Sequence, residues 1–318
     1  MTATKFRVSA PQLFLLLLFY LLSGMMLFAG GSFFPALFSS LFAACLSALA
    51  FALCGRGSSA ELYAIAFGAF ASPLRLCTAF FSALPLAGTL AAFSEDISAF
   101  HGEAAAPLAP LLALFAVFGV CGGFCRAARF SELCVFALAG ACILALFGGG
   151  GGMSFGFPEG ALFAGFDTVG APAVFFSLYL RCVTPENGEA SVYLKNSSFH
   201  PSPLAAGVLA PFAALALYSY FCFAGNNILF SLLSWFFMLS RLLALSVCIA
   251  DLLAYPEKKE GAKCALLSCA FCAFWVVFPS LFAGVAANVQ AFAAVILPCA
   301  LFICSVFARK KSARAHYE

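Results

Sequence analysis

The chain has 318 residues, of which 64% are apolar and only 9% are charged. A soluble domain carries about a quarter charged residues, so most of this protein's surface is expected to face lipid rather than water. The net charge of +3 is small and the basic residues are scattered between apolar runs, which excludes a nucleic-acid binder. The composition also excludes a cytosolic enzyme and a secreted disulfide scaffold. It predicts an all-α polytopic membrane protein whose main surroundings are the lipid bilayer.

Apolar runs of about 20 residues, the length that crosses a bilayer once, recur about ten times. The predicted spans are 11–31, 34–54, 73–93, 106–125, 131–148, 160–181, 203–223, 229–253, 264–286 and 289–308. Residues 55–72 hold an apolar run too short to span, which predicts an interfacial helix. The five glycines at 148–152 predict a flexible hinge or spacer, because the phosphate-binding residues of a P-loop do not follow them. Residues 183–202 form a polar loop.

The positions of the basic residues provide an independent test of this topology. Connections on the cytoplasmic side of a membrane are enriched in Lys and Arg. When successive spans alternate in direction, every basic residue except Arg241 falls in connections on the same side of the membrane. Both termini are therefore predicted to be cytoplasmic. Residues 1–318 are therefore predicted to form a single transmembrane domain with a cytoplasmic tail at 309–318.

Ten spans divide into two halves of five, and an odd number per half inverts the second half relative to the first. This geometry is typical of inverted-repeat transporters, with repeat one at about 8–150 and repeat two at about 158–308. In such proteins the ligand lies near the midplane, where the first helix of each half is broken. The predicted breaks are Ser23-Gly24 in helix 1 and the segment from Phe166 to Pro172 in helix 6.

The candidate ligand-binding residues are polar or small residues inside these spans. They are Ser23, Gly24, Thr89, Asp167, Thr168, Gly170 and Arg241. Small residues and proline also serve close helix packing or a simple kink, and Asp167 has the alternative of reaching the outer water.

Arg241 needs a partner inside the membrane. Asp167, a chain carbonyl in a broken helix and a ligand carboxylate are the candidates, and snorkelling toward the headgroups is the alternative. Asp251 is ten residues away along the same helix, about 15 Å, so it is too far to be the direct partner.

Other polar features have weaker functional interpretations. Arg129 and Glu132 are spaced for a helical ion pair, which is either a cytoplasmic gate latch or an interface anchor. The fifteen cysteines lie in apolar runs and are interpreted as small hydrophobes. Cys269 and Cys272 lack a second pair or a nearby histidine, so we expect no metal there. No catalytic motif and no cofactor-binding motif is recognised, and an enzyme is not expected.

Three segments together resemble one family, the endospore germination permeases of the amino acid, polyamine and organocation transporter superfamily. The first is Val8-Ser9-Ala10-Pro11-Gln12-Leu13-Phe14-Leu15, which is similar to the family's Ser-x-x-Gln before helix 1. The second, Gly122 to Glu132, resembles the family's turn from helix 4 into helix 5. The third, Phe237-Met238-Leu239-Ser240-Arg241, resembles its helix 8 segment with an Arg. The Asp167-Thr168 segment departs from the pattern.

This resemblance implies a ten-helix permease fold that binds a small nutrient, such as an amino acid, between helices 1, 3, 6 and 8. It also implies a sensor that works with A and C type receptor subunits in the spore inner membrane. An ion-coupled secondary transporter of amino acids or organic cations in a bacterial cytoplasmic membrane is the alternative. A scaffold within a membrane complex is a third interpretation.

Overall fold

The computed structural model describes residues 9–29, 31–54, 63, 66–102, 108, 111, 124–148, 150–155, 203–224, 228–254, 303–304 and 306–307. These residues form helices joined by turns, and no β-strand occurs among them. Three of the helices are long and apolar enough to span a membrane, over Ala10–Leu27, Ala127–Leu146 and Leu204–Ala224. The predicted all-α class is therefore confirmed. The count of ten spans and the inverted repeat stay predictions.

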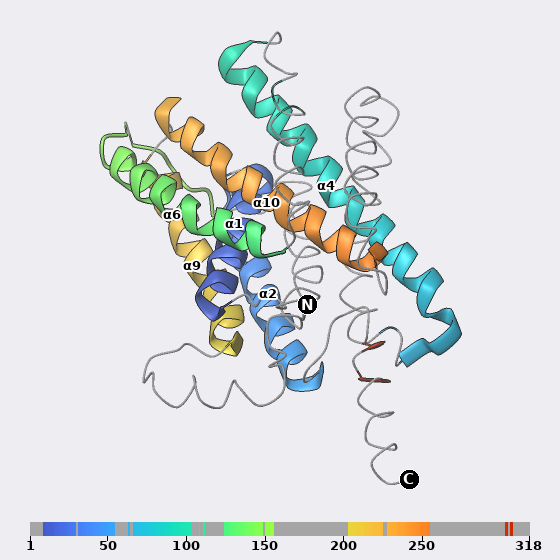
Figure 1. The fold of residues 1–318 in the computed structure, drawn as a ribbon. Coiled ribbons are helices and arrows are strands. Elements are labelled where there is room, and N and C mark those ends of the chain that lie inside the picture. Colours follow the sequence, from blue (N-terminus) through green and yellow to red (C-terminus); the bar gives the residue numbers. More distant parts are fainter. Residues whose placement is uncertain are drawn as a thin grey trace.

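The described helices follow the predicted spans in order (Figure 1). They are α1 (Ala10–Phe28), α2 (Phe33–Cys54), the short 3-10 helix η1 (Gly68–Phe70), α4 (Ala71–His101), α6 (Phe124–Leu146), α9 (Pro203–Ala224) and α10 (Ile228–Ala254). The bounds of α2, α9 and α10 agree with the predicted spans to within one residue at each end.

Two predicted boundaries are wrong because polar residues near a helix end do not stop a helix. Helix α4 continues beyond residue 93 through the polar segment at 94–101 and ends at His101, followed by the C-cap Gly102, whose φ of 80° favours glycine. Helix α6 starts at Phe124 rather than at residue 131, so Arg126 and Arg129 lie on a helix instead of a loop.

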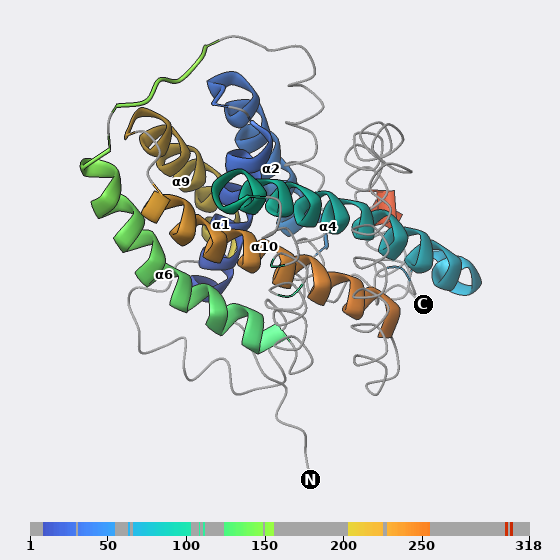
Figure 2. The same cartoon turned by 90° about the horizontal axis from the view of Figure 1, so that it is seen from above.

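Helix α1 occupies the centre of the described bundle. Seen from above, α9, α6, α10 and the edge of α4 lie around it, while α2 packs against α9 (Figure 2). Several of its side chains are fully buried: Leu13, Leu16, Phe19, Tyr20 and Leu22. The helix begins in a capping box, in which Gln12 N donates to Ser9 Oγ at 3.4 Å and Ser9 N donates to Gln12 Oε1 at 2.9 Å.

The predicted break in helix 1 is absent. Helix α1 is continuous from Ala10 to Phe28 through Ser23 and Gly24. The Ser23 hydroxyl donates to the carbonyl oxygen of Tyr20 at 2.9 Å, so this side chain bonds within its own helix turn. A lone glycine weakens a helix by only about 1 kcal/mol, and packing on every side of α1 outweighs that loss. The predicted break in helix 6 lies outside the described residues.

The segment that follows the glycine run is held by hydrogen bonds, and the predicted flexibility of the glycines themselves stays a prediction. Ser154 N donates to Gly31 O at 3.0 Å, Phe33 N donates to Ser154 O at 2.9 Å, and the Ser154 hydroxyl lies 2.9 Å from that of Ser32. The segment therefore ties the end of α6 to the turn between α1 and α2. Both connections were predicted on the outer side, so the contact agrees with the predicted alternation.

The start of α4 is also fixed, by a buried hydrogen bond. The Tyr63 hydroxyl lies 2.8 Å from the Thr78 hydroxyl, and Tyr63 is 1% exposed. Burial raises the pKa of Tyr63, and the hydrogen bond with Thr78 only partly opposes this. Tyr63 therefore remains a neutral hydroxyl that attaches the predicted interfacial segment to α4.

One face of α6 is suited to lipid. Phe136 is 78% exposed, and Phe147, directly after the helix, is 79% exposed. Further exposed apolar side chains on this helix are Leu133, Val135, Ile143 and Leu146. A soluble protein rarely exposes so many large apolar side chains together. Within the described part of the chain, this surface is consistent with embedding in a membrane.

Gly148 provides a test of the glycine-rich segment. A Cβ at this position would collide with the carbonyl oxygen of Ala224 and lie 3.0 Å from its carbonyl carbon, whereas a Cβ at Gly152 meets nothing within 4 Å. We expect Gly148→Ala to lower the stability in detergent by about 1–3 kcal/mol, as overpacking does. Gly152→Ala is the matched control and should change little. Equal melting temperatures for the two variants would contradict the packing of this segment.

Candidate functional site: a buried arginine between three helices

Arg241 lies near the middle of α10 and is 0% exposed. Its side chain contacts two other helices. Nε donates to Thr89 Oγ1 of α4 at 2.9 Å, and Nη1 donates to the carbonyl oxygen of Tyr20 of α1 at 3.1 Å. The guanidinium also lies over the Tyr20 ring, with Cζ 4.3 Å from the ring centroid. One cation therefore connects α10 to both α1 and α4.

These contacts support one of the partners proposed for Arg241, whereas Asp167 lies outside the described residues and a ligand carboxylate stays a prediction. In the structure, Arg241 donates a hydrogen bond to a main-chain carbonyl, which is one of the predicted partners. That carbonyl belongs to a continuous helix rather than to a broken one. Snorkelling is wrong, because the guanidinium is buried and points to the neighbouring helices. Three of the predicted site residues, Ser23, Thr89 and Arg241, are brought together around Tyr20.

Ser23 and Gly24 explain why the Tyr20 carbonyl is accessible to a side chain from α10. Cα–Cβ bonds tilt toward the N-terminus of a helix, so side chains three and four residues later lie beside a given carbonyl. Positions 23 and 24 hold a small hydroxyl and no side chain at all. Both residues are buried. A larger pair of side chains here would cover the carbonyl. Gly24 therefore keeps the Tyr20 carbonyl accessible and does not break the helix.

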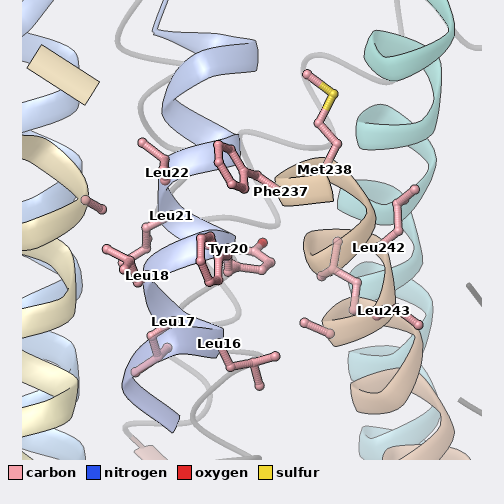
Figure 3. Packing of buried hydrophobic residues seen from close by; sticks show 14 of the residues in the cluster. Leu16, Leu17, Leu18, Tyr20, Leu21, Leu22, Phe237, Met238, Leu242 and Leu243 are labelled. Atoms are coloured by element: carbon pink, nitrogen blue, oxygen red, sulfur yellow. The ribbon is translucent and has the colours of Figure 1, made fainter. Parts of the chain in front are cut away.

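The surroundings of Arg241 are apolar, which strengthens its hydrogen bonds. Phe19 and Phe237 stack with ring centroids 5.3 Å apart. Figure 3 shows Tyr20 in the space between α1 and α10 beside Phe237, with Met238, Leu242 and Leu243 along α10. Low local polarity increases the strength of a charge-assisted hydrogen bond and the cost of leaving a charge unsolvated. The neutral contacts therefore orient the guanidinium firmly.

A second hydroxyl contact lies next to Arg241. Ser240 and Ser131 of α6 have their hydroxyl oxygens 3.3 Å apart, and both residues are buried. Neither serine was predicted as a site residue. Tyr20 was also missed, because its carbonyl and ring act through a contact with a residue 221 positions away in the chain. The proximity of Tyr20 to Ser23 in sequence was the available signal.

Asp167, Thr168 and Gly170, the remaining predicted ligand-binding residues, lie outside the described residues. Their contribution to the site stays a prediction.

A polar contact that the sequence did not predict joins α4 and α10. Trp235 Nε1 donates to Asp96 Oδ2 at 3.1 Å, and the rings of Phe93 and Trp235 meet edge to face at 6.0 Å between centroids. Asp96 was assigned to an outer loop, so its helical neighbours were not considered. Its position seven residues after Thr89, two helical turns, was the missed signal.

Glu132 has a different partner from the predicted one. No ion pair joins Arg129 to Glu132 in the described residues, and Glu132 Oε1 instead accepts a hydrogen bond from Gln12 Nε2 at 2.9 Å. Gln12 uses its other amide atom in the capping box of α1. Two of the segments that resemble the germination permeases therefore meet in space, 120 positions apart in sequence.

The described residues provide no alternative chemical centre. Among them, no group of three His, Cys, Asp or Glu side chains could hold a metal ion, and the cysteines are free thiols at Cys45, Cys77, Cys134, Cys142, Cys222 and Cys304. Cys269 and Cys272 lie outside the described residues. What the Arg241 site offers chemically is an oriented guanidinium, whose planar fork matches a carboxylate.

Comparison with known proteins adds no family to this description. No family model matches the chain, and no curated protein matches it.

Thr89 tests the hydrogen bond that connects α4 to Arg241. We expect Thr89→Val to lower the free energy of unfolding by about 1.5–3 kcal/mol, because the valine keeps the shape but removes the acceptor of a charged donor. Thr89→Ser keeps the hydroxyl and should recover most of that loss. Denaturation in detergent, followed by helical circular dichroism, measures both. A valine variant as stable as the serine variant would refute the contribution of this bond.

Proposed function

We propose that this chain is a membrane-embedded protein that binds a small nutrient bearing a carboxylate, such as an amino acid, at the Arg241 site. The observation that carries the proposal is the buried guanidinium at the junction of α1, α4 and α10. A charged group at the centre of a bilayer costs about 2.5–3.5 kcal/mol even on the lenient insertion scale, and such residues serve function by default.

The chemistry of the site favours a carboxylate. A guanidinium presents several N–H donors in one plane, which match the two oxygens of a carboxylate. Thr89 and Ser23 add hydroxyl groups close by, and hydroxyls bond to either an ammonium or a carboxylate. Phe19 and Phe237 give the site apolar surroundings, which strengthen the polar contacts of a bound ligand.

The resemblance to the germination permeases gives this binding a role. We infer that the chain is the permease-like subunit of a spore germinant receptor, which senses the nutrient in the spore inner membrane together with A and C type subunits. The resembling segments contribute Arg241 to the site and supply the contact between Gln12 and Glu132. In this role the ligand stabilises one arrangement of the helices, which requires a higher affinity for that arrangement.

Ligand binding is tested with purified protein in nanodiscs by ligand-dependent thermal stabilisation. The probes are the proteinogenic L-amino acids, each compared with the amine that lacks its carboxylate, for example valine with isobutylamine. A ligand at a hundred times its Kd stabilises by about 2.7 kcal/mol. We expect stabilisation by at least one amino acid and none by the matched amine. Equal stabilisation by both would contradict carboxylate recognition.

Two variants connect the binding to the site. Arg241→Met replaces a buried cation by an apolar side chain of similar length and leaves only the neutral Thr89 hydroxyl and Tyr20 carbonyl behind. It should therefore be less stable but still folded, as circular dichroism would show, and lose the response. Tyr220→Phe is the control, because it removes a hydrogen bond from Tyr220 to the Cys142 carbonyl between α9 and α6. A response that survives Arg241→Met would overturn the site. Uptake of the same amino acid into proteoliposomes would identify the alternative, a secondary transporter.

A further inference from the structure

The contact between Trp235 and α4 lies on the same pair of helices as the Arg241 site. Thr89, Phe93 and Asp96 follow one another at spacings of four and three residues, so they form one stripe along α4. Thr89 meets Arg241, while Phe93 and Asp96 meet Trp235. Because residue numbers rise along α4 as they fall along α10, the two helices run antiparallel and the two contacts are successive layers between them.

The distance between these layers follows from helix geometry. Seven residues on α4 and six on α10 separate them, which corresponds to about 10 Å along the helix axes. The positive-inside pattern places the Asp96 end of α4 and the Trp235 end of α10 on the outer side. A molecule that approaches Arg241 from that side between α4 and α10 therefore meets the layer of Phe93 and Trp235 first.

Both rings in this layer are held. Phe93 is 0% exposed and packs edge to face with Trp235. The indole has one N–H donor, and Asp96 accepts it at 3.1 Å, so the carboxylate fixes the ring orientation. A hydrogen bond to a charged acceptor is stronger than one between neutral groups, yet a single bond can break on the timescale of side-chain and loop motion.

We propose that Trp235 is the outer closure of the Arg241 site, a positioning residue that Asp96 holds against Phe93. With the bond formed, the two rings cover the site from the outer side. When the bond breaks, the indole turns away from Phe93 and the route to Thr89 and Arg241 opens. The role of this closure in ligand access rests on the proposed function, whereas the opening itself can be measured without a ligand.

The test uses a thiol at the site as a probe of access. Thr89→Cys introduces a side chain of similar size, and a membrane-impermeant methanethiosulfonate is added from the outer side. Peptide mass spectrometry measures modification at position 89 separately from the native cysteines. In this background, Asp96→Leu and Trp235→Phe each remove the hydrogen bond. We expect modification at position 89 to become about tenfold faster in both, the change that a loss of about 1.4 kcal/mol produces.

Matched controls separate this closure from general loosening. Asp96→Asn keeps a carbonyl acceptor without its charge and should accelerate modification less than Asp96→Leu does, and Tyr220→Phe breaks a bond between other helices. Native Cys134 is fully buried between α6 and α10 and is the internal reference. Unchanged modification at position 89 would overturn the proposal. Equal acceleration at position 89 and at Cys134 would also overturn it, because the effect would then be unfolding.

Ligand kinetics distinguish this proposal from the proposed function. For an amino acid that stabilises the parent protein, Trp235→Phe should raise the association and dissociation rates together and leave Kd nearly unchanged. Accelerated modification without binding of any amino acid would keep the closure and reject the proposed function. Normal binding with unchanged modification would keep the function and reject the closure.

Discussion

The described bundle depends on the burial of one cation. The Arg241 guanidinium is fully buried, so protein groups must replace its hydration, and the structure supplies the Thr89 hydroxyl to Nε and the Tyr20 carbonyl to Nη1. Leaving a buried charge without such groups costs several kcal/mol. The relative positions of α1, α4 and α10 are therefore coupled, because a shift of either neighbour relative to α10 breaks a hydrogen bond in apolar surroundings.

This coupling explains several choices in the sequence of α1. A carbonyl within a helix can accept a further donor only where the following turn leaves room, and Ser23 and Gly24 leave it beside Tyr20. The Tyr20 ring then covers the guanidinium, and Phe19 stacks on Phe237 one residue away. The central helix is therefore continuous, although a broken one was expected. A break would expose a backbone acceptor, and here the unbroken helix supplies that acceptor at the Tyr20 carbonyl.

How far the sequence predicts this site differs between its parts. The bounds of α2, α9 and α10 follow from hydropathy, because an apolar run of bilayer length forms a helix with few alternatives. Arg241 and Thr89 also stand out in the sequence, because they are polar residues inside such apolar runs. Arg241 is the one basic residue outside the predicted cytoplasmic connections. The Tyr20 carbonyl does not, because any residue has one. Asp96 was missed because polarity in α4 was interpreted as a helix end, although the segment is helical and the side chains of Phe93 and Ile97 on it are fully buried.

The geometry of Arg241 also bears on how a ligand would act. Nε and Nη1 hold α4 and α1 to α10 through Thr89 and Tyr20, so a carboxylate that takes these donors replaces the bonds between helices. Ligand affinity then differs between the arrangement in which the helices hold the guanidinium and the one in which the ligand does. Such a difference is what an equilibrium between two states requires before a ligand can shift it. In the proposed sensor, recognition and signalling would therefore use the same hydrogen bonds, and no separate relay from the ligand to the helices is needed.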